Sequence, residues 1–136
     1  MNDCIFCKIL KGEIPSCKIY EDDHAIVFLD IAPFEKGHVL VVPKVHAQQI
    51  TELPVAELQP VMEVVQKTAR VLKEKLPCDG INILQNNGAC AMQTVPHVHI
   101  HLVPRWNRKE GEEMNWTAKA YDSMDEMKAL AARLAF

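Results

Sequence analysis

The stretch Pro96-His97-Val98-His99-Ile100-His101-Leu102-Val103-Pro104-Arg105 alternates three histidines with apolar residues. A period of two is that of a β-strand, so we expect the three imidazoles on one face and Val98, Ile100 and Leu102 on the other. Large and β-branched side chains favour a strand that is buried on its apolar face. Imidazole titrates near neutral pH, binds metal ions and attacks electrophiles, so the row of histidines predicts a functional site. The alternative is a strand whose solvated face is rich in histidine.

The rest of the chain predicts more strands and three helices. Apolar runs predict strands over 17–20, 24–29, 37–43 and 81–84, the first two joined as a hairpin. A polar loop over 85–92 leads toward the histidine strand. We expect short helices over 5–10 and 124–134, the latter capped by Asp122 or Ser123. A long helix is expected from Thr51 to Pro77, with a core face that comprises Leu58, Val61, Met62, Val65, Ala69 and Leu72.

Length and composition favour a single soluble domain over residues 1–136, with 49% hydrophobic and 24% charged residues. The formal net charge of −3 argues against a nucleic-acid partner, because phosphate affinity needs a basic surface. We find no export signal at the N-terminus and no apolar run long enough to span a membrane. An odd count of five cysteines, in a chain without an export signal, predicts a reducing location, the cytoplasm.

Cys4 and Cys7 form a C-x-x-C pair, which is typical of a redox dithiol or of half a zinc site. Two reduced thiols on one helical turn are an equally simple interpretation. Asp30, His38 and His46 each follow or begin a predicted strand, where a turn former or a strand-edge residue is the ordinary interpretation.

The segment His97–Val103 resembles the histidine-triad signature, His-φ-His-φ-His-φ-φ, where φ is hydrophobic. The order of the other motifs extends the similarity over residues 4–105; they are Cys4–Leu10, Glu13–Pro15, Tyr20–Asp22, Phe28–Pro33, Gly37–His46 and Gln93–His97. The chain is identified as a member of the Hint-like branch of the histidine triad (HIT) superfamily, of the zinc-bearing bacterial type. This resemblance implies an α+β fold with an antiparallel sheet of about five strands, one long helix and a C-terminal helix, assembled as a homodimer.

The resemblance also implies a reaction. His99 would attack the α-phosphorus of a purine ribonucleotide, and water would release the nucleoside monophosphate from the covalent nucleotidyl-histidine. His101 would hydrogen-bond the phosphate oxygens, with His38 and His97 supporting the triad. The implied activity is that of a nucleoside phosphoramidase that releases AMP or GMP. The implied nucleotide contacts are Asp30 with the ribose, Phe28 and Ile31 with the base, and Asn86, Gln93 and Thr94 with the phosphate or leaving group.

In zinc-bearing relatives the C-x-x-C pair joins two histidines, which here are His46 and His97. The resemblance therefore implies one structural zinc per chain, held by Cys4, Cys7, His46 and His97 in a closed four-coordinate site.

Some residues depart from the family pattern. Met92 stands where most members have glycine, Thr94 replaces a serine, and the Leu102–Arg105 segment resembles the Fhit branch. These departures leave open the alternative of a dinucleoside polyphosphate hydrolase. Two further alternatives are a nucleotide-binding regulatory protein and a zinc hydrolase that uses the triad as a three-histidine metal site.

Overall fold

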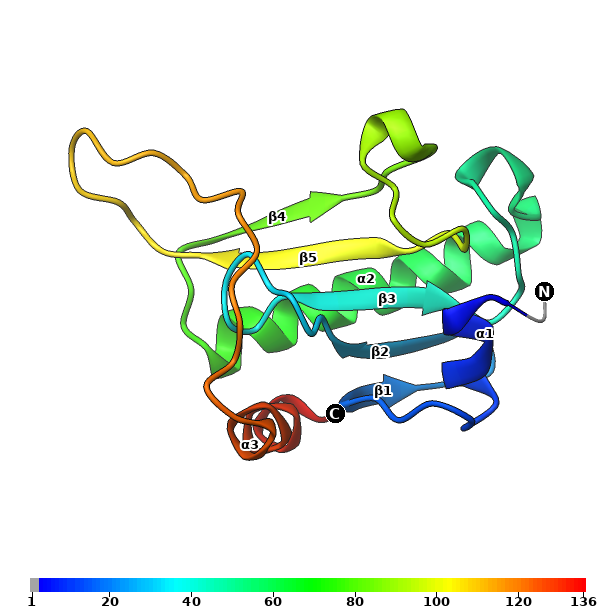
Figure 1. Cartoon of the computed structure of the whole chain (residues 1–136), viewed down its shortest axis with the longest axis horizontal. Helices are drawn as coiled ribbons and strands as arrows, with labels where there is room; N and C mark the ends of the chain where they lie inside the picture. The colour runs from blue at the N-terminus through cyan, green and yellow to red at the C-terminus, as the bar shows by residue number, and fades with distance from the viewer. Residues whose placement is uncertain (1–2) are drawn as a thin grey trace.

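The computed structural model describes residues 3–136; Met1 and Asn2, part of the N-terminus examined for an export signal, lie outside it. Figure 1 shows one antiparallel sheet with strand order β1-β2-β3-β5-β4, crossed on one face by a long helix. This arrangement confirms the expected α+β class. The helices and strands are α1 (Ile5–Leu10), β1 (Lys18–Glu21), β2 (Ala25–Leu29), β3 (Val39–Pro43), α2 (Val55–Lys75), β4 (Gly80–Leu84), β5 (Ile100–Arg105) and α3 (Met124–Leu134).

The central strands β2 and β3 are buried on both faces, which explains their unbroken apolar runs. On one face Val27, Val39 and Val41 belong to the main core with residues of α2 and α3. On the other face Phe28 and Leu40 pack with Phe6 of α1 in a second cluster. The short helix α1 therefore covers part of the sheet, and its N-terminus brings the C-x-x-C pair to that face.

The long helix α2 begins at Val55, four residues later than expected, because Pro54 holds an extended backbone and a separate 3₁₀ turn occupies Ile50–Glu52. Its buried face also differs from the expected one: Leu58 is 38% exposed and Met62 is 51% exposed. The buried face is turned around the helix axis relative to the predicted one, because Val64 and Thr68 lie in the core in place of Leu58 and Met62. Thr68 is tolerated there because its hydroxyl donates a 2.7 Å hydrogen bond to the carbonyl oxygen of Val64.

The histidine strand starts later than its alternating pattern indicates. Regular pairing with β3 begins at Ile100, opposite Val41, so His97 and His99 precede the ladder. Pro43 has no amide proton, and its carbonyl oxygen accepts a hydrogen bond from the imidazole of His97 rather than from a backbone amide. The last carbonyl of β3 therefore bonds to the side chain of His97, at a position where longer pairing of β3 with β5 would have used a backbone amide.

The C-terminal helix α3 has the predicted bounds, and the hydroxyl of Ser123 caps it by accepting a 3.1 Å hydrogen bond from the amide of Glu126. Among residues 3–136, no helix combines the length and apolar character that crossing a membrane requires.

Candidate functional site

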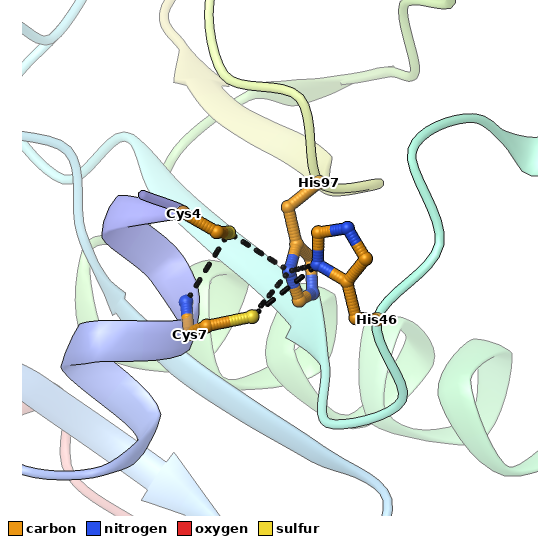
Figure 2. Close-up of side chains that lie close together, drawn as sticks. All are labelled: Cys4, Cys7, His46 and His97. Atoms are coloured by element: carbon orange, nitrogen blue, oxygen red, sulfur yellow. Dashed lines mark hydrogen bonds between the residues drawn. The ribbon is translucent and has the colours of Figure 1, made fainter. Parts of the chain in front are cut away.

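Four predicted metal ligands, separated by up to 93 residues, meet beside the N-terminus of α1 (Figure 2). Cys7 lies in α1 and Cys4 is the N-cap of that helix, while His46 comes from the loop after β3 and His97 from the start of the triad. The sulfur of Cys4 lies 3.4 Å from Nδ1 of His97, and the sulfur of Cys7 lies 3.3 Å from Nδ1 of His46. The two Nδ1 atoms are 3.1 Å apart. All four ligand atoms lie within 4.8 Å of one another.

This spacing suits a tetrahedral metal ion. Zinc bonds of about 2.3 Å to sulfur and about 2.0–2.1 Å to nitrogen require S···N separations of about 3.6 Å and N···N separations of about 3.3 Å. Nε2 of His97 donates a 2.8 Å hydrogen bond to the carbonyl of Pro43, which leaves Nδ1 as the ligand atom. Burial lowers the pKa of His97, which favours the neutral imidazole that a metal needs. The residues therefore fit zinc.

His99 is held in one tautomer by the backbone. Its Nδ1 lies 2.7 Å from the carbonyl oxygen of His97, which only accepts, so Nδ1 carries the proton. The lone pair therefore sits on Nε2. Phe6 packs its ring against the imidazole at 87°, with centroids 5.0 Å apart. Burial lowers the pKa of His99, which keeps this imidazole neutral and nucleophilic near neutral pH.

His38 and His101 form a hydrogen-bonded pair with a fixed direction. The amide of Phe34 donates to Nδ1 of His38 at 3.1 Å, so the proton of neutral His38 is on Nε2. That Nε2 lies 2.9 Å from Nδ1 of His101, which must accept. His101 therefore carries its own proton on Nε2. Burial lowers the pKa of His38 to about 3 and that of His101 to about 4, so both rings are neutral.

Asp30 lies beside this pair, with a carboxylate oxygen 3.6 Å from Nε2 of His38. Its other oxygen accepts a 2.9 Å hydrogen bond from the amide of Ala32. Burial raises the pKa of Asp30. Asp30, His38 and His101 are close enough to hold a cation. However, the Phe34 amide places a proton on the His38 nitrogen that a metal would need, so the hydrogen-bonded relay explains this cluster better.

The three histidines of the triad do not converge as one metal site. In the part of the chain that the structure describes, the two groups compatible with a metal take His97 in one case and His101 in the other, and neither includes His99. This division disfavours the alternative of a zinc hydrolase with a three-histidine catalytic site.

The polar loop before the triad is ordered largely by Gln93. Its side-chain oxygen accepts from the amide of Gly88 at 2.7 Å, and its nitrogen donates to the carbonyls of Gln48 and Val95. Both amide hydrogens are thus engaged by protein carbonyls, so Gln93 shapes the loop rather than offering a free donor. Asn86 is half-buried and Thr94 is exposed in the same loop.

The two apolar residues expected near a base differ in exposure. Ile31 is 73% exposed next to Asp30, whereas Phe28 is 4% exposed and packs against Phe6. Sequence reasoning missed Phe6 and the amide of Phe34. The Phe34 amide leaves no signal in the sequence because every residue except proline has the same donor.

The HIT domain model matches residues 11–108 of the chain. This chain belongs to the HIT domain family. Adenosine 5'-monophosphoramidase HNT1 of Candida albicans is 45% identical over 123 residues, covering 88% of this chain and 81% of that protein.

Solved HIT structures match the fold closely. A HIT-like protein from Bartonella henselae superimposes with a TM-score of 0.88 at 37% identity, covering 98% of this chain and 95% of that one. A zinc-bound histidine triad family protein from Mycobacterium smegmatis has a TM-score of 0.82 at 38% identity, covering 98% and 94%. A zinc-bearing relative of the same fold agrees with the Cys/His cluster found in this HIT protein.

Proposed function

We propose that this protein hydrolyses purine nucleoside phosphoramidates through a covalent nucleotidyl-histidine at His99. The observation that carries the proposal is the pair of fixed tautomers, in which His99 presents a lone pair at Nε2 while His101 presents a proton at Nε2. A nucleophile beside a hydrogen-bond donor suits attack on phosphorus. The phosphoramidase named among the relatives supports the choice of substrate.

The reaction would have two displacements. Nε2 of His99 attacks the α-phosphorus, the P–N bond breaks, and the amine leaves with a proton taken from solvent. A water molecule then attacks the nucleotidyl-histidine and the N–P bond breaks, which releases the nucleoside monophosphate, returns one proton to solvent and regenerates neutral His99. In each step the Nε2 proton of His101 would bind the phosphate oxygen on which charge increases, while His38 keeps His101 in that tautomer.

Asp30 would recognise the ribose. Its carboxylate is partly exposed at the end of β2 and can accept hydrogen bonds from two vicinal hydroxyls. The exposed side chain of Ile31 offers apolar surface for the base, and Phe28 would help to hold the base. Asn86 and Thr94 would contact the phosphate or leaving group, and Gln93 would hold their loop in place.

One structural zinc per chain would be held by the Cys/His cluster. The ion would tie α1 and the loop after β3 to His97, whose carbonyl orients the nucleophile. Zinc would contribute stability and positioning rather than a reactive water, because all four ligands come from the protein and close the coordination shell.

The protein would act as a homodimer joined through the β4 edge. β4 is the last strand of the sheet, so one side of its backbone is unpaired. Ile83 of β4 is 50% exposed and, opposite the buried Leu102, faces the same side of the sheet as α2. Val55, Leu58 and Met62 form an exposed apolar stripe on α2. A second copy would extend the sheet and cover these residues.

The decisive experiment follows AMP release from adenosine 5'-monophosphoramidate. We expect turnover by the wild type, resistant to brief chelator treatment, and loss of at least about a thousandfold in His99→Ala. His24→Ala is the matched control, since the side chain of His24 bonds to Glu57 of α2. AMP release by His99→Ala at the wild-type rate would exclude the histidine nucleophile. Absence of release by folded wild type would exclude the phosphoramidase activity.

A further inference from the structure

The segment after β5 crosses back over the loop that joins β2 to β3. In Figure 1 this orange segment passes beside the loop before it reaches α3. We call residues 115–122 the strap and residues 30–37 the β2–β3 loop. The strap contacts the loop through hydrogen bonds at its backbone and through ion pairs. Its polar contacts are Asn115 with Phe34, Lys119 with Pro33 and Glu35, Tyr121 with Gly37, and Asp122 with Lys36.

One of these contacts fixes the peptide group that orients His38. The amide of Lys119 donates a 2.7 Å hydrogen bond to the carbonyl of Pro33. That carbonyl belongs to the same peptide unit as the Phe34 amide, which donates to Nδ1 of His38. One planar peptide group is therefore held at its oxygen by the strap and at its hydrogen by the catalytic relay. A hydrogen bond accepted at the carbonyl also strengthens the amide as a donor.

Asn115 fixes the next peptide group. Its side-chain nitrogen donates to the carbonyl of Phe34 at 2.8 Å and to the carbonyl of Thr117 at 2.8 Å, while its oxygen accepts from the amide of Thr117. Asn115 thus stabilises the strap through its bonds to Thr117 and joins the strap to the β2–β3 loop through its bond to Phe34. Both peptide groups that flank the Phe34 α-carbon are consequently held by the strap.

A column of contacting side chains connects the same segments. Trp116 meets Phe34 edge-on at 5.9 Å, and Phe34 in turn lies 5.3 Å from the ring of His38. The guanidinium of Arg105 lies 4.9 Å from the centroid of the Trp116 ring. A cavity of about 310 Å³ borders this column and is lined by Asn115, Glu35 and Arg105 among others. The strap is therefore held by hydrogen bonds and by contacts with the aromatic rings, because the cavity beside it leaves that side without close packing.

We propose that the strap is a positioning element for catalysis, and that Asn115 acts through Phe34 to keep His38 protonated at Nε2. The role for the reaction rests on the proposed phosphoramidase function. Without the strap the Pro33–Phe34 peptide would be free to rotate, His38 would populate its other tautomer, and His101 would lose the partner that sets its proton.

The first test is the tautomer of His38 in the zinc-loaded protein, read from its ring nitrogens by long-range ¹H–¹⁵N NMR. We expect the Nε2–H form in the wild type and a mixture of both forms in Asn115→Asp, which keeps the size of the side chain but replaces its donor by an acceptor. Asn115→Ala provides a second variant without added charge. Lys119→Ala is the matched control, because it removes the contact with Glu35 but keeps the backbone amide. Unchanged His38 tautomers in both Asn115 variants would overturn the proposal.

The second test is kinetic. Asn115→Asp should lower kcat about tenfold and change KM less than about twofold, because the relay acts on the transition state. In a His38→Ala background the same substitution should have little further effect, since one residue acts through the other. An equal loss in both backgrounds would show that Asn115 does not act through His38. The NMR measurement needs no substrate, so failure of the phosphoramidase proposal would leave the strap test intact.

Discussion

The carbonyl of His97 accepts a 2.7 Å hydrogen bond from His99, while the imidazole of His97 lies 3.4 Å from the sulfur of Cys4. His97 thus contributes its side chain to the Cys/His cluster and its backbone carbonyl to His99, the proposed nucleophile. His97 and His99 therefore have separate partners, and in the proposed reaction the Cys/His cluster would position His99 without taking part in the chemistry.

Zinc binding should follow this division. We expect about one zinc per chain in the wild type and in His99→Ala, and loss of zinc in His46→Ala, because His46 supplies a ligand and His99 does not. Metal content after gel filtration, measured by elemental analysis, checks this. Zinc retained in His46→Ala but lost in His99→Ala would contradict the assignment of ligands.

Stability should fall in mild acid. Burial lowers the pKa of His38 to about 3 and that of His101 to about 4, against an ordinary value of 6.5. At a pH between the lowered pKa values and 6.5, these two histidines are protonated in the unfolded chain but neutral in the folded one. The free energy of unfolding therefore falls as the pH drops below 6.5. Each buried histidine should contribute on the order of 1 kcal/mol per pH unit. Urea unfolding between about pH 7 and about pH 5 measures this slope.

The free energy of unfolding of His38→Gln should depend less steeply on pH than that of the wild type. The difference in slope should correspond to about one proton fewer taken up on unfolding. His24→Gln is the matched control, since the side chain of His24 is 45% exposed. Equal slopes in His38→Gln and the wild type would argue against a buried neutral His38.

Gly37→Ala should destabilise the protein by about 2 kcal/mol and impair activity. Gly37 has a φ of +101°, and an added Cβ would lie 2.6 Å from Cδ1 of Leu76 and 3.2 Å from Cγ of Pro104. Gly12→Ala separates the backbone strain from the steric clash. Gly12 also has a positive φ, of +78°, but a Cβ added there would have no atom within 4 Å. A thermal shift no larger in Gly37→Ala than in Gly12→Ala would exclude the steric contribution.

Met92→Gly should stabilise the protein by about 0.5–1 kcal/mol relative to Met92→Ala. Met92 adopts a left-handed conformation with a φ of +72°, and its side chain is 69% exposed, so little packing is lost. Met92→Ala keeps the backbone strain and serves as the control. Denaturant midpoints measure the difference, and a glycine variant no more stable than Met92→Ala would show that the left-handed conformation at this position costs little.

The dimer proposal predicts that Ile83→Lys produces a monomer. A charge on the exposed apolar face of β4 would be buried without a partner in the dimer. Sedimentation equilibrium measures the mass, and circular dichroism checks that the monomer stays folded. Lys109→Glu, on the exposed loop after β5, is the control for a change of charge. A wild-type protein that is monomeric at all accessible concentrations would rule out the dimer.

The sequence by itself determined the fold class, because apolar runs, turn residues and the Ser123 cap are local signals that agree with one another. The alternating histidines located the site, and the order of motifs matched the HIT family. The sequence did not predict which face of α2 is buried. Leu58, Met62 and Val64 are all apolar, and only packing decides which of them is buried.

Only the tertiary structure decided which groups each histidine of the site contacts. Cys4 and His97 lie 93 residues apart, and nothing local indicates that they meet. The tautomers of His38 and His99 depend on one backbone amide and one backbone carbonyl, groups that all ordinary residues share. A sequence specifies side chains directly, but it specifies the direction of a backbone donor only through the complete fold.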